Sequence, residues 1–507
     1  MADNLPCATG FSVAVRTEPE RSPRPSFASA GSRTEVAQTV AGLRLRATLL
    51  HTGAPEGACA WRPEKAAVVA GELYNRCELR SLLPGVGEPA GDGDGDAQLV
   101  LALFDIYDLH AFRLLNGRFA AVVVAGGRAV LATDHAGSVP LYTCAAPGRV
   151  LAATEAKTLR TAAPGRRLTG ARAVPGMRGV HQVPAGTVLD IGVGATGCAP
   201  HTTWAPPHSR RILPEDRAAE AVRAALESAV DARTGPGTPL VLISGGIDSS
   251  GVAALAARGP GATTDTVSMG TEERNEFPQA RAVAGHLGTN HTEVVVPASE
   301  LVARLPHTVW AAECRDPDII EYLLPLTALY LRLEGPGRRV LTGYGADIPL
   351  GGMHREGRLP ALDTALAHDM ATFDGLNEMT PVLSGIGGHW STHPFWDREV
   401  LELLTSLEAG LKSRHGRDKW VLRAAMRDLL PHETVTRPKL GVHEGSGTTS
   451  SFTRLLTDAG LPPPHVHRAK RLVVGELFQQ VVVDGLHPDE VDLPAVVHRL
   501  DRREFVP

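Results

Sequence analysis

Little net charge, no long apolar run and no paired cysteine motif are the first features of this 507-residue sequence. A formal net charge of -5 argues against a nucleic-acid partner held by bulk electrostatics. No apolar run approaches the roughly 20 residues that span a bilayer. The opening segment, MADNLPCATGFSVAVR, lacks the basic stretch and apolar core of a secretion signal. We therefore expect a cytoplasmic protein with no membrane and no nucleic-acid partner.

The cysteines are scattered, with neither a CxxC pair nor a histidine at zinc-like spacing. We predict reduced, unpaired and buried thiols at Cys7, Cys59, Cys77, Cys144, Cys198 and Cys314.

The two halves of the chain differ in their hydrophobic pattern, and the length itself favours two domains. Residues 66–74, 117–127 and 128–137 are short apolar runs bounded by turn residues, which predicts strands in the first half. A polar, proline-rich stretch, His201 to Arg211, then has the composition of a linker. Beyond it, amphipathic helices such as residues 215–233 alternate with apolar strands that end in glycine. We predict one domain over residues 1–207 and an α/β domain with a parallel sheet over residues 208–507.

The most informative segment is Ser244-Gly245-Gly246-Ile247-Asp248-Ser249-Ser250, which follows the strand LVLI and precedes an apolar helix. Glycine lets the backbone approach an anion, and the N-terminus of a helix offers free N–H groups and a positive dipole end. A glycine turn with a serine N-cap is the alternative reading, and the whole motif in a strand–loop–helix setting outweighs it. The segment therefore predicts a phosphate-binding loop.

This loop resembles the pyrophosphate-binding motif of the N-type ATP pyrophosphatases, and no Gly-Lys-Ser/Thr follows as in a Walker A loop. The resemblance implies ATP as cosubstrate and Mg²⁺ held by Asp248 with a second carboxylate, Asp347, in the segment that begins at Gly343. It also implies that Val267, Ser268 and Met269 contact the adenine.

Further motifs on both sides of the loop widen the resemblance. Residues 71–75, 116–119, 134–142 and 154–157 look like glutaminase-domain signatures of glutamine-dependent asparagine synthetases. Residues 418–423 and 437–439 look like that family's C-terminal helix and loop. The resemblance implies an Ntn-hydrolase-like αββα sandwich, classed as α+β, followed by an ATP-pyrophosphatase synthetase domain.

One departure from that family concerns the nucleophile of the glutaminase. The family requires an N-terminal cysteine before Gly and an aliphatic residue, whereas here Gly10-Phe11 places the internal residue Thr9 at that position. Cys7 is near, but six residues precede it. We therefore expect an inactive first domain with a structural or interface role, and a nucleophile other than ammonia from glutamine.

An asparagine synthetase without a glutaminase resembles the β-lactam synthetase and carbapenam synthetase branch of the family. Residues 316–322, 342–352 and 377–379 carry the match to β-lactam synthetases. The resemblance implies an antibiotic-biosynthesis ligase that adenylates the β-carboxylate of N2-(2-carboxyethyl)-L-arginine. Its secondary amine then closes the ring, which gives deoxyguanidinoproclavaminate, AMP and pyrophosphate.

The same resemblance implies roles for individual side chains. Tyr344 backed by Glu378 would take the proton from the amine, since a free phenol with a pKa of about 10 needs a partner to act near neutrality. Lys439 would stabilise the developing negative charge. Asp369 would pair with the guanidinium of the arginine-derived substrate, and Tyr322 and Gly345 would line the substrate pocket.

Two other functions stay open at this point. One is an amide ligase that uses free ammonia and an aspartate-like substrate, and the other is a non-catalytic binding or regulatory homologue. The sequence also leaves the oligomeric state open, with a homodimer as one option.

Overall fold

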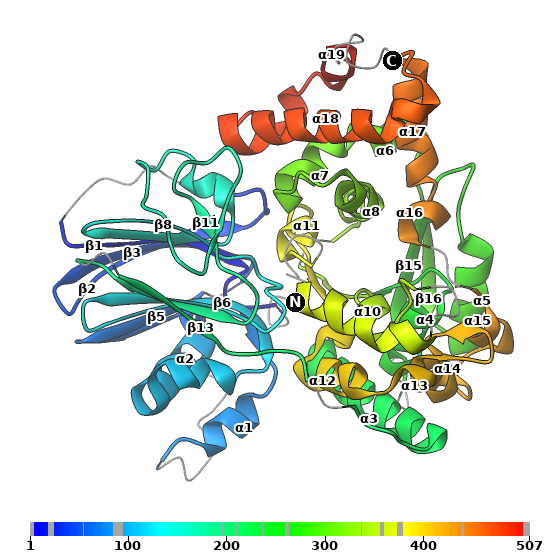
Figure 1. Cartoon of the computed structure of the whole chain (residues 1–507), viewed down its shortest axis with the longest axis horizontal. Coiled ribbons are helices and arrows are strands. Elements are labelled where there is room, and N and C mark those ends of the chain that lie inside the picture. Colours follow the sequence, from blue (N-terminus) through cyan, green and yellow to red (C-terminus); the bar gives the residue numbers. More distant parts are fainter. Residues whose placement is uncertain are drawn as a thin grey trace.

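The computed structural model describes residues 5–18, 25–53, 55–84, 95–194, 197–207, 210–235, 237–258, 263–335, 337–354, 359–372, 379–438 and 441–499. The first half of the chain forms two antiparallel sheets, and the second half forms a parallel sheet covered by helices (Figure 1). Within the described ranges, no helix is long and apolar enough to cross a membrane.

The two antiparallel sheets have the strand orders β10-β11-β8-β9-β1-β3-β2 and β13-β12-β7-β6-β5-β4. Their strands are β1 (Gly10–Arg16), β2 (Ser32–Val40), β3 (Leu43–His51), β4 (Cys59–Arg62), β5 (Lys65–Leu73), β6 (Gly117–Ala125), β7 (Arg128–Thr133), β8 (Tyr142–Ala146), β9 (Arg149–Ala153), β10 (Arg172–Ala173), β11 (His181–Gln182), β12 (Thr187–Gly192) and β13 (Cys198–Thr202). The helical elements of this half are η2 (Glu56–Ala58), α1 (Arg76–Ser81), α2 (Asp96–Tyr107), η3 (Asp108–Arg113) and η4 (Ala156–Leu159). The three strands predicted between residues 66 and 137 are confirmed as β5, β6 and β7.

Side-chain alternation along the strands explains how the two sheets stack. In β6, Val122 and Val124 face the space between the sheets, while Ala121 and Val123 face α2. This period of two is the one that a β-strand imposes. The α2 side supplies one helical layer of the expected αββα sandwich.

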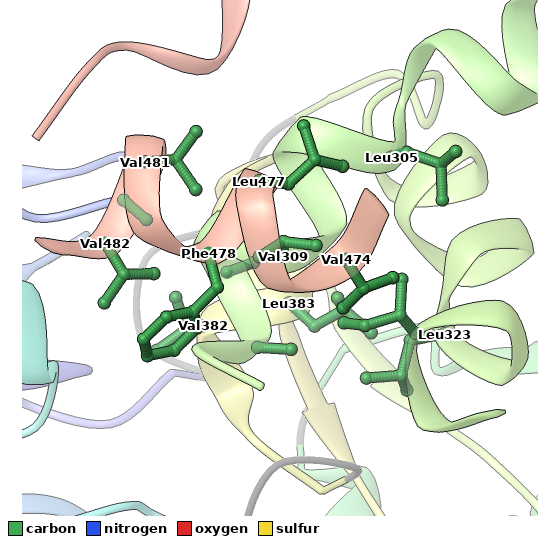
Figure 2. Packing of buried hydrophobic residues seen from close by; sticks show 14 of the residues in the cluster. Leu305, Val309, Leu323, Val382, Leu383, Val474, Leu477, Phe478, Val481 and Val482 are labelled. Atoms are coloured by element: carbon green, nitrogen blue, oxygen red, sulfur yellow. The ribbon is translucent and has the colours of Figure 1, made fainter. Parts of the chain in front are cut away.

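On the opposite side, β8 and β9 contact η4 of the first half, and η4 in turn contacts η7 (Gln479–Asp484) of the second half. Ala14, Tyr142 and Leu151 of the first half share one buried cluster with residues of helices α7 (Leu305–Ala312), α8 (Pro317–Tyr330), α11 (Pro381–Gly385) and α18 (Val466–Phe478). In Figure 2 Phe478, Val481 and Val482 lie together with Val309 and Val382 in this cluster. The two halves therefore share a hydrophobic core.

The second half is built on a five-stranded parallel sheet of order β16-β15-β14-β17-β18. Its strands are β14 (Leu240–Leu242), β15 (Asp265–Gly270), β16 (Asn290–Val295), β17 (Arg339–Leu341) and β18 (Trp390–Thr392). Its helices include α3 (Glu215–Thr234), α4 (Ile247–Ala256), α5 (Phe277–Leu287), α6 (Ala298–Ala303), α7 (Leu305–Ala312), α8 (Pro317–Tyr330), α9 (Asp347–Leu350), α10 (Leu359–Thr372), α11 (Pro381–Gly385), α12 (Arg398–Ser406), α13 (Ala409–Lys412), α14 (Trp420–Met426), α15 (His432–Thr436), α16 (Val442–Gly445), α17 (Thr448–Asp458), α18 (Val466–Phe478) and α19 (Leu493–His498), and the π-helical segment η7 (Gln479–Asp484) continues α18. The predicted helix over 215–233 and the strand that precedes the phosphate loop are confirmed.

Helices cover both faces of the parallel sheet, which explains why its strands are apolar on both sides. Val241 and Leu341 pack against α3, α4, α12 and α14, whereas Leu242 and Val340 pack against α7, α8, α11 and α18. The carboxyl ends of β14, β15 and β17 therefore meet at one edge, where ligands of α/β sheets bind.

The last strand of the first half ends at Thr202, and α3 begins at Glu215. Residues 208 and 209 lie outside the described residues, so the boundary at 207/208 stays a prediction.

All six cysteines are free thiols as expected. The expectation that all of them are buried is wrong, because only Cys144 is buried.

Candidate active site

The phosphate loop joins β14 to α4 at the carboxyl edge of the sheet. Gly245 has a φ of 74°, and a Cβ there would lie 2.5 Å from Gln279, so the turn requires glycine. The Ser244 N–H donates to Ser249 Oγ at 3.1 Å, which closes the loop over the first turn of α4. The first N–H groups of α4 thus lie at the cavity, where they can bind phosphate oxygens.

A second loop, after β17, packs directly onto the phosphate loop. A Cβ on Gly343 would lie 2.4 Å from the Ser249 backbone nitrogen, so Gly343 allows this close approach. At Gly345, whose φ is 86°, a Cβ would lie 1.7 Å from Trp396 Nε1. The Trp396 indole instead donates to the Gly345 carbonyl at 2.8 Å. These glycines place the loop that carries Tyr344 and Asp347 against the helix that carries Asp248.

The carboxylates of Asp248 and Asp347 converge on the ammonium group of Lys419. Lys419 Nζ lies 2.7 Å from Asp347 Oδ1 and forms an equally direct ion pair with Asp248. Burial opposes the charge of this fully buried lysine, but the two aspartates outweigh it and raise the lysine's pKa. Asp248 and Asp347 are thus brought together as predicted, and a cation already lies between them.

Lys419 is a site residue to which the sequence assigned no role. It precedes α14 with a φ of 53°, a left-handed conformation that is uncommon for lysine. The available signal was its place in the segment 418–423, which resembles the family's C-terminal helix. Its partner Asp248 lies 171 residues away, so the ion pair depends on the tertiary fold.

One cavity runs along the two loops and is lined by most of the predicted binding residues. The predicted residues on its wall are Ser244, Gly246, Ile247, Asp248, Ser249, Val267, Ser268, Met269, Tyr322, Gly343, Tyr344, Gly345 and Asp347. Gly245 and Ser250 belong to the same loop but do not line this cavity, and Ser250 is fully buried in α4. Residues for adenine, phosphate and substrate therefore share one continuous space.

Tyr344 lies between two other aromatic side chains in this cavity. Its ring meets the Tyr322 and His393 rings edge-on, with 5.6 Å and 5.4 Å between the ring centroids. Thr342 links the group, because its Oγ1 lies 2.7 Å from His393 Nδ1 and accepts from the Tyr344 N–H at 3.1 Å. Burial and the nearby Arg118 guanidinium hold the pKa of His393 well below its usual range, so the imidazole is neutral. The phenol thus has a fixed and uncharged neighbour.

Asp369 lies on α10, and its Oδ2 lies 2.6 Å from His354 Nε2, within hydrogen-bond distance. It is not among the residues that line the cavity, so its role toward a guanidinium stays a prediction. Two of the three predicted catalytic residues, Glu378 and Lys439, lie outside the described residues.

Arg423 is a second residue whose importance the sequence did not indicate. This buried guanidinium donates to Asp418 Oδ1 at 3.0 Å and to the carbonyls of Val435 and Arg437 at 2.6 and 3.0 Å. It therefore ties the residue before Lys419 to the segment that leads to Pro438 on the cavity wall.

The position of the expected glutaminase nucleophile is an ordinary internal residue. The Thr9 N–H donates to the Leu50 carbonyl at 2.8 Å, and the Ala8 carbonyl accepts from the Gly71 N–H. Thr9 thus offers a peptide N–H in this chain, and an inactive glutaminase stays a prediction.

Comparisons with known proteins place this geometry in a family. The asparagine synthase family model matches residues 221–379 and 391–489, and the glutamine amidotransferase domain model matches residues 60–161. The carboxyethyl-arginine β-lactam-synthase of Streptomyces clavuligerus is 62% identical over 98% of both chains. A putative glutamine-hydrolysing asparagine synthetase of Mycobacterium tuberculosis H37Rv is 29% identical over 58% of this chain and 49% of its own. Among solved structures, the NMN synthetase of Francisella tularensis covers 55% of this chain and 98% of its own at 14% identity, with a TM-score of only 0.27. The matched models and the whole-chain relative show that this chain belongs to the asparagine synthase family of ATP-dependent amide ligases.

Proposed function

We propose that this chain forms a β-lactam by adenylating the β-carboxylate of N2-(2-carboxyethyl)-L-arginine and closing the ring with the substrate's own secondary amine. The 62% identity over nearly the whole chain to a carboxyethyl-arginine β-lactam-synthase carries the proposal. The products would be deoxyguanidinoproclavaminate, AMP and pyrophosphate.

The cavity supplies groups for both chemical steps. In the first, the substrate carboxylate attacks the α-phosphate of ATP and pyrophosphate leaves. The N–H groups of α4 favour this step by holding negative charge, and the buried Lys419 holds Asp248 and Asp347 in place at the cavity. In the second, the amine attacks the acyl-adenylate and AMP leaves. The amine must lose a proton, and Tyr344 is the group in this cavity to which we assign its removal, with Glu378 behind it. We assign Lys439 to the charge that develops as AMP leaves.

The residues at the phosphate loop also suit Mg²⁺. Asp248 and Asp347 point to one place, since both lie within ion-pair distance of the same Lys419 nitrogen. Mg²⁺ is held in many nucleotide sites by one or two carboxylates together with phosphate oxygens. Asp248 and Asp347 would hold the ion, and Mg²⁺ would neutralise phosphate charge when bound.

The whole-chain relative favours an amine within the substrate over free ammonia. It is 62% identical over 98% of both chains and is a carboxyethyl-arginine β-lactam-synthase, whereas the asparagine synthetase relative is 29% identical over 58% of this chain. This difference supports ring closure rather than an ammonia-dependent reaction.

Mass spectrometry of the products made from ATP, Mg²⁺ and carboxyethylarginine tests the proposal. A product one water lighter than the substrate, with equimolar AMP and pyrophosphate, is expected. Pyrophosphate release with aspartate and ammonia, but not with carboxyethylarginine, would favour the ammonia-dependent ligase instead. No turnover with either would favour the non-catalytic homologue.

Replacing Asp248 or Asp347 with asparagine should raise the Mg²⁺ concentration that adenylation requires. Each change keeps the shape of the side chain and removes one of the two negative charges that would face the ion. Exchange of labelled pyrophosphate into ATP, measured across a Mg²⁺ titration, reports the shift. Normal exchange by both variants at low Mg²⁺ would show that neither aspartate holds the metal.

Asp369→Ala should weaken binding of the arginine-derived substrate by about 2–5 kcal/mol and leave ATP binding nearly unchanged, because a buried guanidinium would lose its anionic partner. Asp363→Ala on the same helix is the matched control, since Asp363 is also partly exposed and pairs with Arg210. Affinities for carboxyethylarginine and for an analogue with an uncharged tail provide the measurement. If the unmodified protein binds both equally, Asp369 has no such role.

A further inference from the structure

The Glu72 carboxylate of β5 reaches out of the first half of the chain and is held mainly by the second half. Arg339 donates to it twice, at 2.8 and 2.7 Å, and the Trp390 indole donates at 2.9 Å. Tyr74 donates to the same oxygen at 2.9 Å and its hydroxyl also lies 3.0 Å from Thr392 Oγ1. Burial alone would raise the pKa of Glu72, but Arg339 and these donors lower it to about 2. The carboxylate is therefore ionised whenever the protein is folded near neutral pH.

The partners of Glu72 and Tyr74 belong to the two strands that lead into the active site. Arg339 and Trp390 are the first residues of β17 and β18, and they are paired in the parallel ladder. The chain reaches Tyr344 five residues after Arg339, and β18 is followed directly by His393. Each strand has three residues and rises about 3.3 Å per residue, so a displacement at its start acts within about 7 Å of its end.

Arg118 makes the third contact of this kind. It lies directly opposite Glu72 in the β5–β6 ladder, so the two charged side chains share one face of the sheet. Its guanidinium donates to the Met379 carbonyl and lies 5.1 Å from the Trp390 ring centroid. Met379 is the residue that follows Glu378 in the chain. Three side chains of the first half thus hold the three segments next to Tyr344, His393 and Glu378.

We propose that Glu72, Tyr74 and Arg118 are positioning residues for ring closure, which set the place of the Tyr344 base without touching the substrate. This role rests on the proposed function. Adenylation depends on the phosphate loop between β14 and α4 and on Asp347, whose loop follows β17. Ring closure depends on that loop as well, and in addition on the segments next to His393 and Glu378, which the contacts to Trp390 and Met379 hold. Loss of the Glu72 contacts should therefore slow ring closure more than adenylation.

A second interdomain ion pair offers a matched control. Lys157 lies between Glu155 and Glu313, at 2.9 Å from each, and all three side chains are at most 4% exposed. Glu313 also accepts the N–H groups of Ala156 and Lys157 across the two halves. None of these residues lines the cavity or joins β17 or β18. Glu313→Gln removes a buried interdomain charge as Glu72→Gln does, but at a distance from the base.

The experiment compares lactam formation with pyrophosphate–ATP exchange in each variant. Glu72→Gln should lower the ratio of lactam rate to exchange rate by about 10- to 100-fold, because a small misplacement of a catalytic group has effects of that size. Glu313→Gln should keep the ratio of the unmodified protein, even if both variants melt at a lower temperature. Tyr74→Phe removes a hydroxyl but no charge, and it should also lower the ratio of lactam rate to exchange rate. If Glu72→Gln does not fold, the result for Tyr74→Phe tests the positioning role by itself.

Unchanged ratios in both Glu72→Gln and Tyr74→Phe would overturn the positioning role while leaving the proposed function intact. An equal fall in the ratio for Glu313→Gln would also overturn the positioning role. Loosening the contact between the two halves at any point would then be enough to slow ring closure. If the unmodified protein forms no lactam from carboxyethylarginine, the proposed function fails and the positioning role fails with it.

Discussion

Tyr344→Phe should stop ring closure and leave adenylation almost intact. The substitution keeps the ring that contacts Tyr322 and His393 and removes the hydroxyl that would take the proton from the amine. General-base catalysis contributes about 10²–10⁴-fold, so lactam formation should fall by that factor. Exchange of labelled pyrophosphate into ATP should continue, since it requires the phosphate loop and the acyl-adenylate but not the base. Glu378→Gln should divide the two steps in the same way.

Tyr322→Phe is the control for this experiment, because it removes a hydroxyl from the adjacent ring in the same cavity. We expect it to change the substrate KM without changing the ratio of lactam formation to exchange. Lactam formation at the full rate by Tyr344→Phe would mean that solvent or a phosphate oxygen accepts the proton.

Lys419→Met should abolish both adenylation and lactam formation. Methionine has nearly the length of lysine but carries no charge. Asp248 and Asp347 would then face each other, next to the ATP phosphates, with no buried cation between them. Removing a charge preorganised for the transition state costs about 10²–10³-fold in rate, and here both steps should fall together because the second needs the adenylate. Initial rates of pyrophosphate exchange and lactam formation provide the test.

Lys157→Met separates this effect from a loss of stability. Lys157 is also fully buried between two carboxylates, but its partners Glu155 and Glu313 do not line the cavity, whereas both aspartates that pair with Lys419 do. Breaking a buried ion pair destabilises a protein by about 3–5 kcal/mol, so both variants should unfold at a lower temperature. Lys157→Met should nevertheless keep its specific activity once folded. If Lys419→Met retained normal exchange, the lysine would serve stability alone.

Local patterns allowed much of this site to be predicted. The phosphate loop is contiguous, and its residues Ser244 to Ser249 owe their arrangement to the strand and helix on either side. The Tyr344 to Asp347 segment follows another strand of the same parallel sheet, so its proximity could be anticipated from the rule that ligands bind at carboxyl ends. Both segments indeed line one cavity.

Contacts between distant segments could not be predicted in this way. Glu72 and Arg339 are 267 residues apart, and Lys419 and Asp248 are 171 apart. A charged residue in isolation is most simply read as a solvated side chain, and only the fold reveals that Lys419, Arg423 and Glu72 are buried with specific partners. The apolar cluster that the two halves share is likewise invisible in the pattern of the first half, whose strands alternate in the usual way.

That shared cluster bears on how the chain could have evolved. Ala14, Tyr142 and Leu151 lie in the same apolar cluster as Val309 and Phe478, so the sheet of the first half forms one wall of the core of the second. Deleting the first half would expose that core to water. Its packing therefore gives a reason to retain the first half that does not depend on glutamine chemistry.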